Sequence, residues 1–226
     1  MLPEMGWLRT RPPKSRPALL TRIGDLSCVQ NASYYRDSLL GKLIPWNADR
    51  KDSNMIAVRL ATLDDAEVIE RQTASVQQLH NGALPSIFKP PSADLFPQQK
   101  LAALIEDPNC IVAVAEIGGN VVGHIYGAVV YRAENEFSPS EFYLYIYQIG
   151  VDDDAQRKGV GTALFNFIRD RARALGLTAL QIDHWAFNAR ARDFFIACGF
   201  SPMRVMMRQA LQDDLDDAPE DYAPSS

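Results

Sequence analysis

The sequence predicts an α+β fold, in which a series of antiparallel strands is combined with about four helices. Apolar, β-branched runs at 110–117 and 121–131 are joined by Gly118-Gly119-Asn120, which is a strong signal for a β-hairpin. At 160–175, by contrast, apolar residues recur at helical spacing with arginines on the opposite face. Both kinds of element therefore belong to one fold.

The regular pattern begins at Met55. Residues 56–60 are expected to form a strand, and 64–79 a helix, because apolar residues there fall near helical spacing. Residues 80–97 are too rich in proline for regular structure and are interpreted as a loop. A short helix at 98–106 precedes the hairpin.

The second half continues this alternation. A polar turn at 134–141 leads to a strand at 142–151, and the helix at 160–175 follows, ended by Gly176. The remaining elements are expected as a strand, a short helix capped by Asn188 and stopped by Gly199, and a last strand. Their ranges are 178–184, 188–198 and 203–211.

Three regions are predicted along the chain. Residues 1–54 have weak periodicity and scattered prolines, and are expected to be a poorly ordered or loosely packed extension. Residues 55–211 form the folded domain, whose first residue, Met55, is a candidate alternative translation start. Residues 212–226 carry six acids and no base, and are expected to be a disordered acidic tail.

Composition excludes several classes of protein. No apolar run approaches the roughly 20 residues that a membrane helix needs, and prolines and arginines interrupt any signal-peptide core. The three cysteines have no CxxC spacing, so neither a disulfide framework nor a metal site is expected. A reducing, cytoplasmic setting fits this usage best.

Charge is distributed unevenly. Residues 1–54 carry 9 Lys and Arg against 5 Asp and Glu, whereas residues 55–226 carry 14 against 23. An acidic domain argues against nucleic-acid binding and is compatible with a cationic partner, although solubility alone also explains it.

A glycine turn opens the helix at 160–175. Residues 156–161 read Gln-Arg-Lys-Gly-Val-Gly, and the missing Cβ atoms of Gly159 and Gly161 let a ligand approach the backbone. The first N–H groups of the helix have no intrahelical partner, and Arg157 and Lys158 add donors. A pyrophosphate-bearing ligand is therefore expected at 156–162.

Two nucleotide-binding folds fit this turn poorly. A P-loop is excluded because no Gly-Lys-Ser/Thr follows, and a dinucleotide fold is disfavoured by the antiparallel strands before the turn. A second motif starts 27 residues after Gly161 and reads Asn188-x-x-Ala191-x-x-Phe194-Phe195-x-x-x-Gly199-Phe200. Together with the opening Val-Arg-Leu-Ala-Thr-Leu-Asp-Asp-Ala of 58–66, it resembles the GNAT superfamily of N-acyltransferases over residues 56–210.

The resemblance implies a mixed, mostly antiparallel sheet of about six to seven strands flanked by about four helices. It also implies that the fourth and fifth strands splay apart and hold acetyl-CoA, the acyl-donor substrate. The backbone of 149–151 would pair with the pantetheine arm, and the N–H groups of 156–162 would hold the pyrophosphate. The residues implied in cofactor binding are Ile149, Gly150, Val151, Gln156, Arg157, Lys158, Gly159, Val160, Gly161, Thr162, Asn188 and Phe195. Asn188 serves equally well as a helix cap.

Acyl transfer to an amine needs a proton acceptor, an oxyanion donor and, for the leaving thiolate, a proton donor. A backbone N–H near 149–151 is the expected oxyanion donor. The catalytic candidates are Tyr145 on the fourth strand and Asp183 and His184 on the fifth, where relatives place such groups. Each also has a structural interpretation, since Tyr145 shares a strand face with other tyrosines and His184 precedes Trp185.

Phe195 departs from the family pattern. Relatives usually carry a tyrosine there, whose hydroxyl is thought to protonate the thiolate, and phenylalanine has no proton to give. The sequence therefore leaves two functions open. The first is an N-acetyltransferase that acts directly, through a ternary complex, on a primary amine of a small molecule or peptide. The second is a non-catalytic module that binds or senses acyl-CoA.

The acceptor is the least specified part of the site. The loop at 80–97 lies where relatives build part of the acceptor wall, and His80, Phe88 and Phe96 are candidates to line it or to pack within the loop. Neither nucleic acid nor a membrane is an expected partner, and a homodimer is left open.

Overall fold

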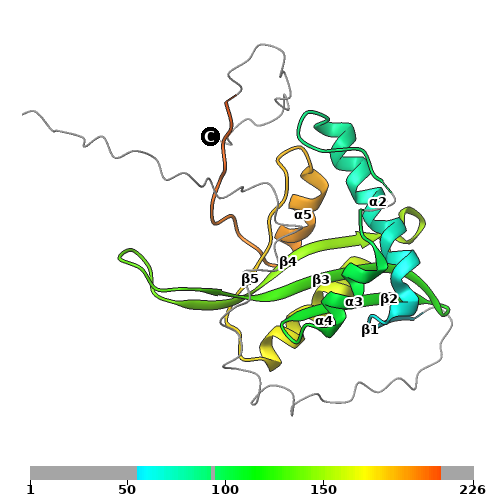
Figure 1. Ribbon diagram of the computed structural model, residues 1–226, viewed down its shortest axis with the longest axis horizontal. Coiled ribbons are helices and arrows are strands. Elements are labelled where there is room, and N and C mark those ends of the chain that lie inside the picture. The colour runs from blue at the N-terminus through cyan, green and yellow to red at the C-terminus, as the bar shows by residue number, and fades with distance from the viewer. Residues whose placement is uncertain (1–54, 93–94, 210–226) are drawn as a thin grey trace, which may run out of the picture.

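The computed structural model describes residues 55–92 and 95–209 (Figure 1). The predicted extension at 1–54 and the predicted acidic tail at 212–226 lie outside these residues. Within the described part of the chain, no helix combines the length and the apolar character that a membrane crossing requires.

Five strands form one sheet in the order β1-β2-β3-β4-β5, so that sequence neighbours are also neighbours in space. The pairs from β1 to β4 are antiparallel, and β5 is parallel to β4. This is the mixed, mostly antiparallel sheet that the resemblance implies, with five strands among the described residues instead of about six to seven. The elements are β1 Ile56–Leu60, η4 Leu63–Asp65, α2 Ala66–Ala83, α3 Gln98–Glu106, β2 Cys110–Ile117, β3 Asn120–Arg132, β4 Glu141–Val151, η5 Asp153–Ala155, α4 Val160–Ala174, β5 Leu180–Gln181 and α5 Ala189–Ala197.

Helices cover both faces of the sheet, and β2 shows why. Successive side chains of a strand point to opposite faces. Ala113 of β2 lies in the core that includes α4, whereas Val112 and Val114 lie in the core that includes α3. Because both faces are covered, β2 reads as a continuous apolar run. The sheet thus lies between α4 on one side and α2 and α3 on the other (Figure 1).

The predicted hairpin is present. Gly118 and Gly119 both have positive φ, at 59° and 82°, and connect β2 directly to β3, with Ile117 opposite Asn120. Two consecutive left-handed residues are what a tight two-residue hairpin turn requires, and glycine adopts them without a Cβ penalty.

Ion pairs of Arg59 hold the connection between β1 and α2 in place. Arg59 contacts the carboxylates of Asp65 and Glu116, each at 2.7 Å. Asp65 also accepts a hydrogen bond from the backbone N–H of Thr62 at 2.8 Å, which caps the first turn. This network ties β1, β2 and the start of the helix together.

Three predicted boundaries need correction. The helix expected at 64–79 is α2, which begins at Ala66 after the short helix η4 and continues to Ala83, two residues before the first proline of the loop. The expected strand at 178–184 is only Leu180–Gln181, because the chain leaves β4 after that point. The expected strand at 203–211 is not formed in its described part, 203–209, which has no strand beside it.

Candidate active site

The central feature of the site is the separation of β4 from β5. β4 pairs with β3 along its whole length, from Glu141 to Val151. It pairs with β5 only at Leu144 and Tyr145. From residue 146 to residue 151 the outer edge of β4 therefore has no neighbouring strand among the described residues. The splay that the resemblance implies is present, and the backbone of 149–151 lies along it.

A β-bulge lies at the start of this open edge. The β3–β4 register passes from Tyr126 opposite Gln148 to Gly127 opposite Ile146, so that Tyr147 is the extra residue. Its ring stacks on Tyr126 at 5.6 Å between centroids and meets Tyr145 edge-on at 4.9 Å. Bulges bend a strand and redirect its side chains, and they are frequent beside active sites. Here the bulge gathers three tyrosines where β4 and β5 part.

The glycine turn lies next along the chain. Gly159 caps α4 in the left-handed conformation with φ 90°, and no side chain caps the helix. Arg157 is also left-handed, with φ 60°, which is uncommon for a residue with a Cβ. The first N–H groups of α4 have no intrahelical partner, and the exposed side chains of Arg157 and Lys158 lie beside them in the chain. Val160 is buried beneath the turn, and Thr162 is exposed.

Gly161 has a second role that the sequence did not reveal. A Cβ at this position would lie 3.2 Å from Cζ of Phe194, so the ring of α5 packs against the first turn of α4. The missing Cβ of Gly161 therefore allows the helices to approach closely, whether or not a ligand lies nearby.

Arg190 is a further candidate for the phosphate site. The side-chain amide of Gln156 donates to the carbonyl of Val151 at 3.1 Å and to the carboxylate of Asp153 at 2.7 Å, while its oxygen accepts from Arg190. A third cation thus reaches the turn from α5. The sequence alone could not distinguish it from Arg192 on the same exposed helix, whose guanidinium instead bonds Asp193.

Asn188 and Phe195 both hold α5 in place. The side-chain oxygen of Asn188 accepts from the N–H of Ala191 at 3.0 Å, which confirms the predicted helix cap. Phe195 is buried, with its ring 5.6 Å from that of Phe194 and 6.0 Å from that of Phe200. Their contacts with the cofactor remain predictions.

Of the three catalytic candidates, the structure brings two together. The hydroxyl of Tyr145 donates to Oδ2 of Asp183 at 2.5 Å, across the point where β4 and β5 diverge. His184 points elsewhere, because its Nδ1 contacts the carbonyl of Trp185 at 3.1 Å and its ring lies 6.4 Å from that of Phe195. Asp183 and His184 are both exposed.

A buried polar pair lies under the open edge of β4. Nδ1 of His124 lies 2.7 Å from Oε1 of Gln72, and His124 is fully buried. Burial lowers the pKa of His124 to about 4, against a weaker opposing effect of the Gln148 amide, so the imidazole is neutral at pH 7. A Cβ on Gly150 would lie 2.7 Å from its Cε1. Gly150 is thus a glycine because the imidazole occupies the adjacent space.

Aromatic rings close the end of α2 against the segment after β5. His80 stacks on Phe88 at 4.9 Å, and Phe88 meets Trp185 edge-on at 4.8 Å. Phe187 lies 5.6 Å from His80. Burial lowers the pKa of His80. Phe96, the third predicted wall residue, does not line this region, because it is buried in the core beside α3.

In the part of the chain that the structure describes, no cluster of three or more His, Cys, Asp or Glu side chains is arranged to hold a metal ion. The polar groups that the structure gathers along the open edge and the turn are backbone groups, the side chains of Arg157 and Lys158, Arg190 and the Tyr145–Asp183 pair.

Comparisons with known proteins place this geometry in a family. The sequence profile described as the acetyltransferase (GNAT) family matches residues 73–200. A structure of a variant of the Bacillus halodurans protein BH1408 superposes with a TM-score of 0.65 at 22% identity, covering 69% of this chain and 99% of that one. A second similar structure is an aminoglycoside acetyltransferase from an uncultured soil metagenomic sample, with a TM-score of 0.50, 21% identity and coverage of 70% and 97%.

One curated relative is similar over a shorter stretch. A mycothiol acetyltransferase of Beutenbergia cavernae is 40% identical over 60 residues, which are 26% of this chain. The match spans 20% of the length of that relative. At 22% and 21% identity, the two solved structures show a common fold with this chain and do not indicate which acceptor it uses.

Proposed function

The chain belongs to the acetyltransferase (GNAT) family, and on that premise we propose that it transfers an acetyl group from acetyl-CoA to a primary amine of a small molecule or peptide. The transfer is direct, within a ternary complex. The observation that carries the proposal is the open outer edge of β4, which ends beside the glycine turn at 156–161.

These two features fit the two ends of acetyl-CoA. A pantetheine arm has amide groups that hydrogen-bond along an unpaired strand edge as an added strand does. The turn supplies the N-terminal N–H groups of α4, with Arg157, Lys158 and Arg190 close by, which suits a pyrophosphate. The thioester then lies near the bulge, where β4 and β5 part.

The Tyr145–Asp183 pair supplies the proton transfers. The neutral amine attacks the thioester carbon, and the carboxylate of Asp183 takes the proton that the nitrogen loses. As the carbon–sulfur bond breaks, Tyr145 gives its hydroxyl proton to the sulfur. The proton on Asp183 passes to Tyr145 along their 2.5 Å hydrogen bond, which restores both groups. In this scheme Tyr145 supplies the proton that Phe195, which has no hydroxyl, cannot supply.

The acceptor is a cationic amine with an apolar or aromatic part. Rings of Phe88, Trp185 and Phe187 gather where the end of α2 meets the segment after β5, and aromatic faces attract ammonium groups. Asp183, which is exposed and lies two residues before Trp185, adds a negative charge to this segment. An ammonium drawn in by these groups loses its proton to water before the transfer begins.

A second function, binding of acyl-CoA without catalysis, is favoured by one observation. Phe195 is 7% exposed and enclosed by other rings, and its side chain has no hydroxyl where relatives usually have one. A module of this kind binds acetyl-CoA through the same strand edge and turn, and transfers nothing.

Release of free thiol from acetyl-CoA, measured across a panel of amines with mass spectrometry of the products, separates the two functions. The enzyme predicts thiol and acetylated amine in equal amounts, dependent on one class of amine. Tight acetyl-CoA binding with no product from any amine contradicts the enzyme and leaves the binding module.

The proton scheme has a matched pair of variants. Tyr145→Phe removes the hydroxyl that bonds Asp183, and Tyr143→Phe makes the same change two residues earlier on β4. We expect Tyr145→Phe to lower kcat about 100-fold with little change in the binding of CoA, and Tyr143→Phe to leave kcat within about two-fold. Equal kcat values for the two variants contradict the assignment.

A further inference from the structure

The backbone of β4 presents two residues to its open edge. The N–H of Asp152 donates to a carbonyl of β3 at 2.9 Å, so this residue faces β3. Backbone groups of successive strand residues point to opposite edges, so Gly150 also faces β3, and Ile149 and Val151 face the open side. The carbonyl of Val151 accepts from the side chain of Gln156, which agrees with this assignment. The N–H groups of Ile149 and Val151 are thus the ones directed at a ligand along this edge.

The side chain of His124 fills the space behind Gly150. The two residues are opposite each other in the β3–β4 register, and a Cβ on Gly150 would lie 2.7 Å from Cε1 of the imidazole. The imidazole also meets α2, where its Nδ1 lies 2.7 Å from Oε1 of Gln72. His124 is fully buried, and Gln72 is 2% exposed. The backbone of Gly150 is therefore in contact with a side chain that α2 holds by a hydrogen bond.

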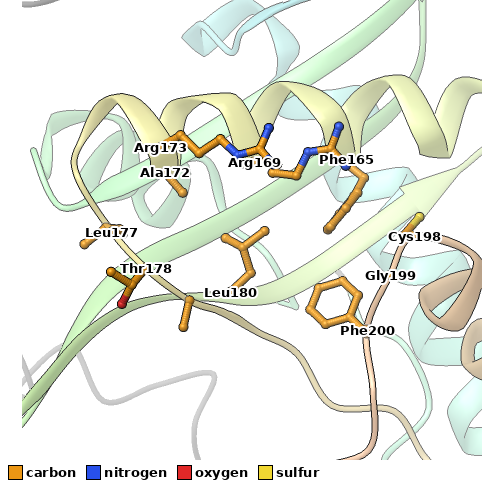
Figure 2. Close-up of a pocket in the computed structure, with 11 residues that line it drawn as sticks. Phe165, Arg169, Ala172, Arg173, Leu177, Thr178, Leu180, Cys198, Gly199 and Phe200 are labelled. Carbon is orange, nitrogen blue, oxygen red and sulfur yellow. The ribbon is translucent and has the colours of Figure 1, made fainter.

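Packing alone does not account for a polar pair at this place. Nε2 of Gln72 and Nε2 of His124 are both buried, and neither makes a hydrogen bond of ordinary geometry to a described residue. Nε of Arg169 is in the same state, but Arg169 borders a cavity of about 350 Å³ under α4, where water has room (Figure 2). Buried polar atoms of this kind cost more free energy than apolar ones of the same shape. What the polar pair adds is a hydrogen bond with a fixed length and direction.

Two neighbours of Gln72 on α2 reach the same part of β4 and the residue after it. Arg71 donates to the carboxylate of Asp152 at 3.1 Å, and Oγ1 of Thr73 donates to Oε1 of Gln148 at 3.4 Å. Three consecutive residues of α2 thus support this segment, the middle one through the imidazole. The outer side of the segment has no neighbouring strand among the described residues. Its position therefore depends on β3 and on these contacts with α2.

We propose that Gln72 and His124 are positioning residues of the acyl-donor edge, an inference that rests on the proposed acetyl transfer. Neither residue touches the substrate. Together they hold Gly150, and with it the N–H groups of Ile149 and Val151, where one of these donates to the thioester oxygen as negative charge develops on it. A misplacement of about 1 Å near a reacting centre lowers a rate about 100-fold, so a small shift of this backbone matters. The pair therefore acts on the rate of transfer, and the glycine turn acts on the affinity for CoA.

Gln72→Met tests the pair, because methionine keeps the length of the side chain and removes the oxygen that His124 contacts. We expect kcat to fall at least about tenfold and the dissociation constant of CoA to stay within about three-fold, since the turn at 156–161 is unchanged. His124→Asn, which leaves the space behind Gly150 open, should have the same effect. Arg169→Met is the matched control on the α4 face of the sheet, and we expect it to leave kcat within about two-fold. Equal losses of kcat in the test and control variants, or weaker CoA binding at an unchanged kcat, overturn the proposal.

Leu104→Ala separates positioning from stability. Leu104 is buried on α3, in the core between α3 and the sheet, and its truncation lowers the free energy of unfolding through the cavity that it leaves. Turnover is measured well below the unfolding transitions of both Leu104→Ala and Gln72→Met. We expect Leu104→Ala to leave kcat within about two-fold. A fall in kcat that matches the fall in Gln72→Met identifies lost stability as the cause and overturns the positioning role.

Backbone amide resonances test the positioning without turnover, with acetyl-CoA as the probe and no amine present. In the wild type we expect saturating acetyl-CoA to shift the amide signals of Ile149, Val151 and Gly161. In Gln72→Met the shifts of Ile149 and Val151 should differ from those of the wild type, whereas the shift of Gly161 should be the same. Identical shifts in the two proteins overturn the positioning role. Absence of turnover in the wild type, with the expected differences present, contradicts the proposed acetyl transfer and leaves the positioning of the donor edge in place.

Discussion

Replacement of Gly150 by alanine tests the packing beneath the open edge of β4. The added Cβ lies 2.7 Å from Cε1 and 3.1 Å from Nδ1 of His124, where ordinary contact begins at 3.4 Å. The imidazole must therefore move by about 0.7 Å (3.4 − 2.7), and it is held by the 2.7 Å contact with Gln72. Overpacking of a core costs about 1–3 kcal/mol, and a strained buried hydrogen bond adds about 1 kcal/mol. We expect Gly150→Ala to lower the free energy of unfolding by about 3 kcal/mol.

Gly82→Ala is the matched control, and it should have the opposite sign. Gly82 lies in the last turns of α2, and a Cβ there meets nothing within 4 Å. The alanine restricts the unfolded chain and favours helix, so we expect a gain of about 0.5 kcal/mol. Urea unfolding followed by circular dichroism measures both values. A loss below about 1 kcal/mol for Gly150→Ala would refute the contact between Gly150 and His124 as the reason for the glycine.

The remaining predictions concern the protonation of His124, the binding of the phosphates and the proton donor to the leaving thiolate. Burial lowers the pKa of His124 from 6.5 to about 4, so as the pH falls the unfolded chain takes up a proton on this side chain at a higher pH than the folded chain does. The contribution of His124 to the free energy of unfolding is therefore at its full value above pH 6.5 and declines toward pH 4. Urea unfolding at pH 7 and pH 5 should show that wild type loses about 2 kcal/mol more than His124→Gln, and equal losses would contradict the shift. Arg190→Ala should weaken CoA binding about five-fold in calorimetry, less at high salt, whereas Arg192→Ala should leave it unchanged; equal effects would remove Arg190 from the phosphate site. Phe195→Tyr should raise kcat less than about three-fold, because Tyr145 already supplies the proton, and a gain above about tenfold would return that role to position 195.

Much of the fold could be predicted because its signals are local. The helix at 98–106 and the strand at 110–117 match the structure at their predicted bounds, and the turn predicted at Gly118-Gly119-Asn120 is present as Gly118-Gly119, with Asn120 already in β3. Apolar runs, helical spacing and turn chemistry depend on residues close together in sequence. The end of β5 could not be predicted in this way. Where β5 stops depends on the divergence from β4, and no short-range pattern in the sequence encodes that.

The site shows the same division. The glycine turn can be predicted because Gly159 immediately precedes a helix and Gly161 lies in its first turn, and in the structure Gly159 is the left-handed cap of α4. The partnership of Tyr145 with Asp183 joins residues 38 apart in sequence, and that of His124 with Gln72 joins residues 52 apart. Pairings of this kind arise from the tertiary fold, so the sequence could nominate Tyr145 and Asp183 separately but could not unite them.

Amide hydrogen exchange with and without acetyl-CoA most directly tests whether the gap beside β4 holds the acyl donor. If it does, the backbone amides of 146–151 and 156–162 become protected when acetyl-CoA saturates the protein, because the pantetheine arm and the pyrophosphate accept hydrogen bonds from them. The amides of α3, on the other side of the molecule from the turn, should exchange at the same rate in both states. Saturating binding, verified by calorimetry, with no new protection in either segment would contradict the account.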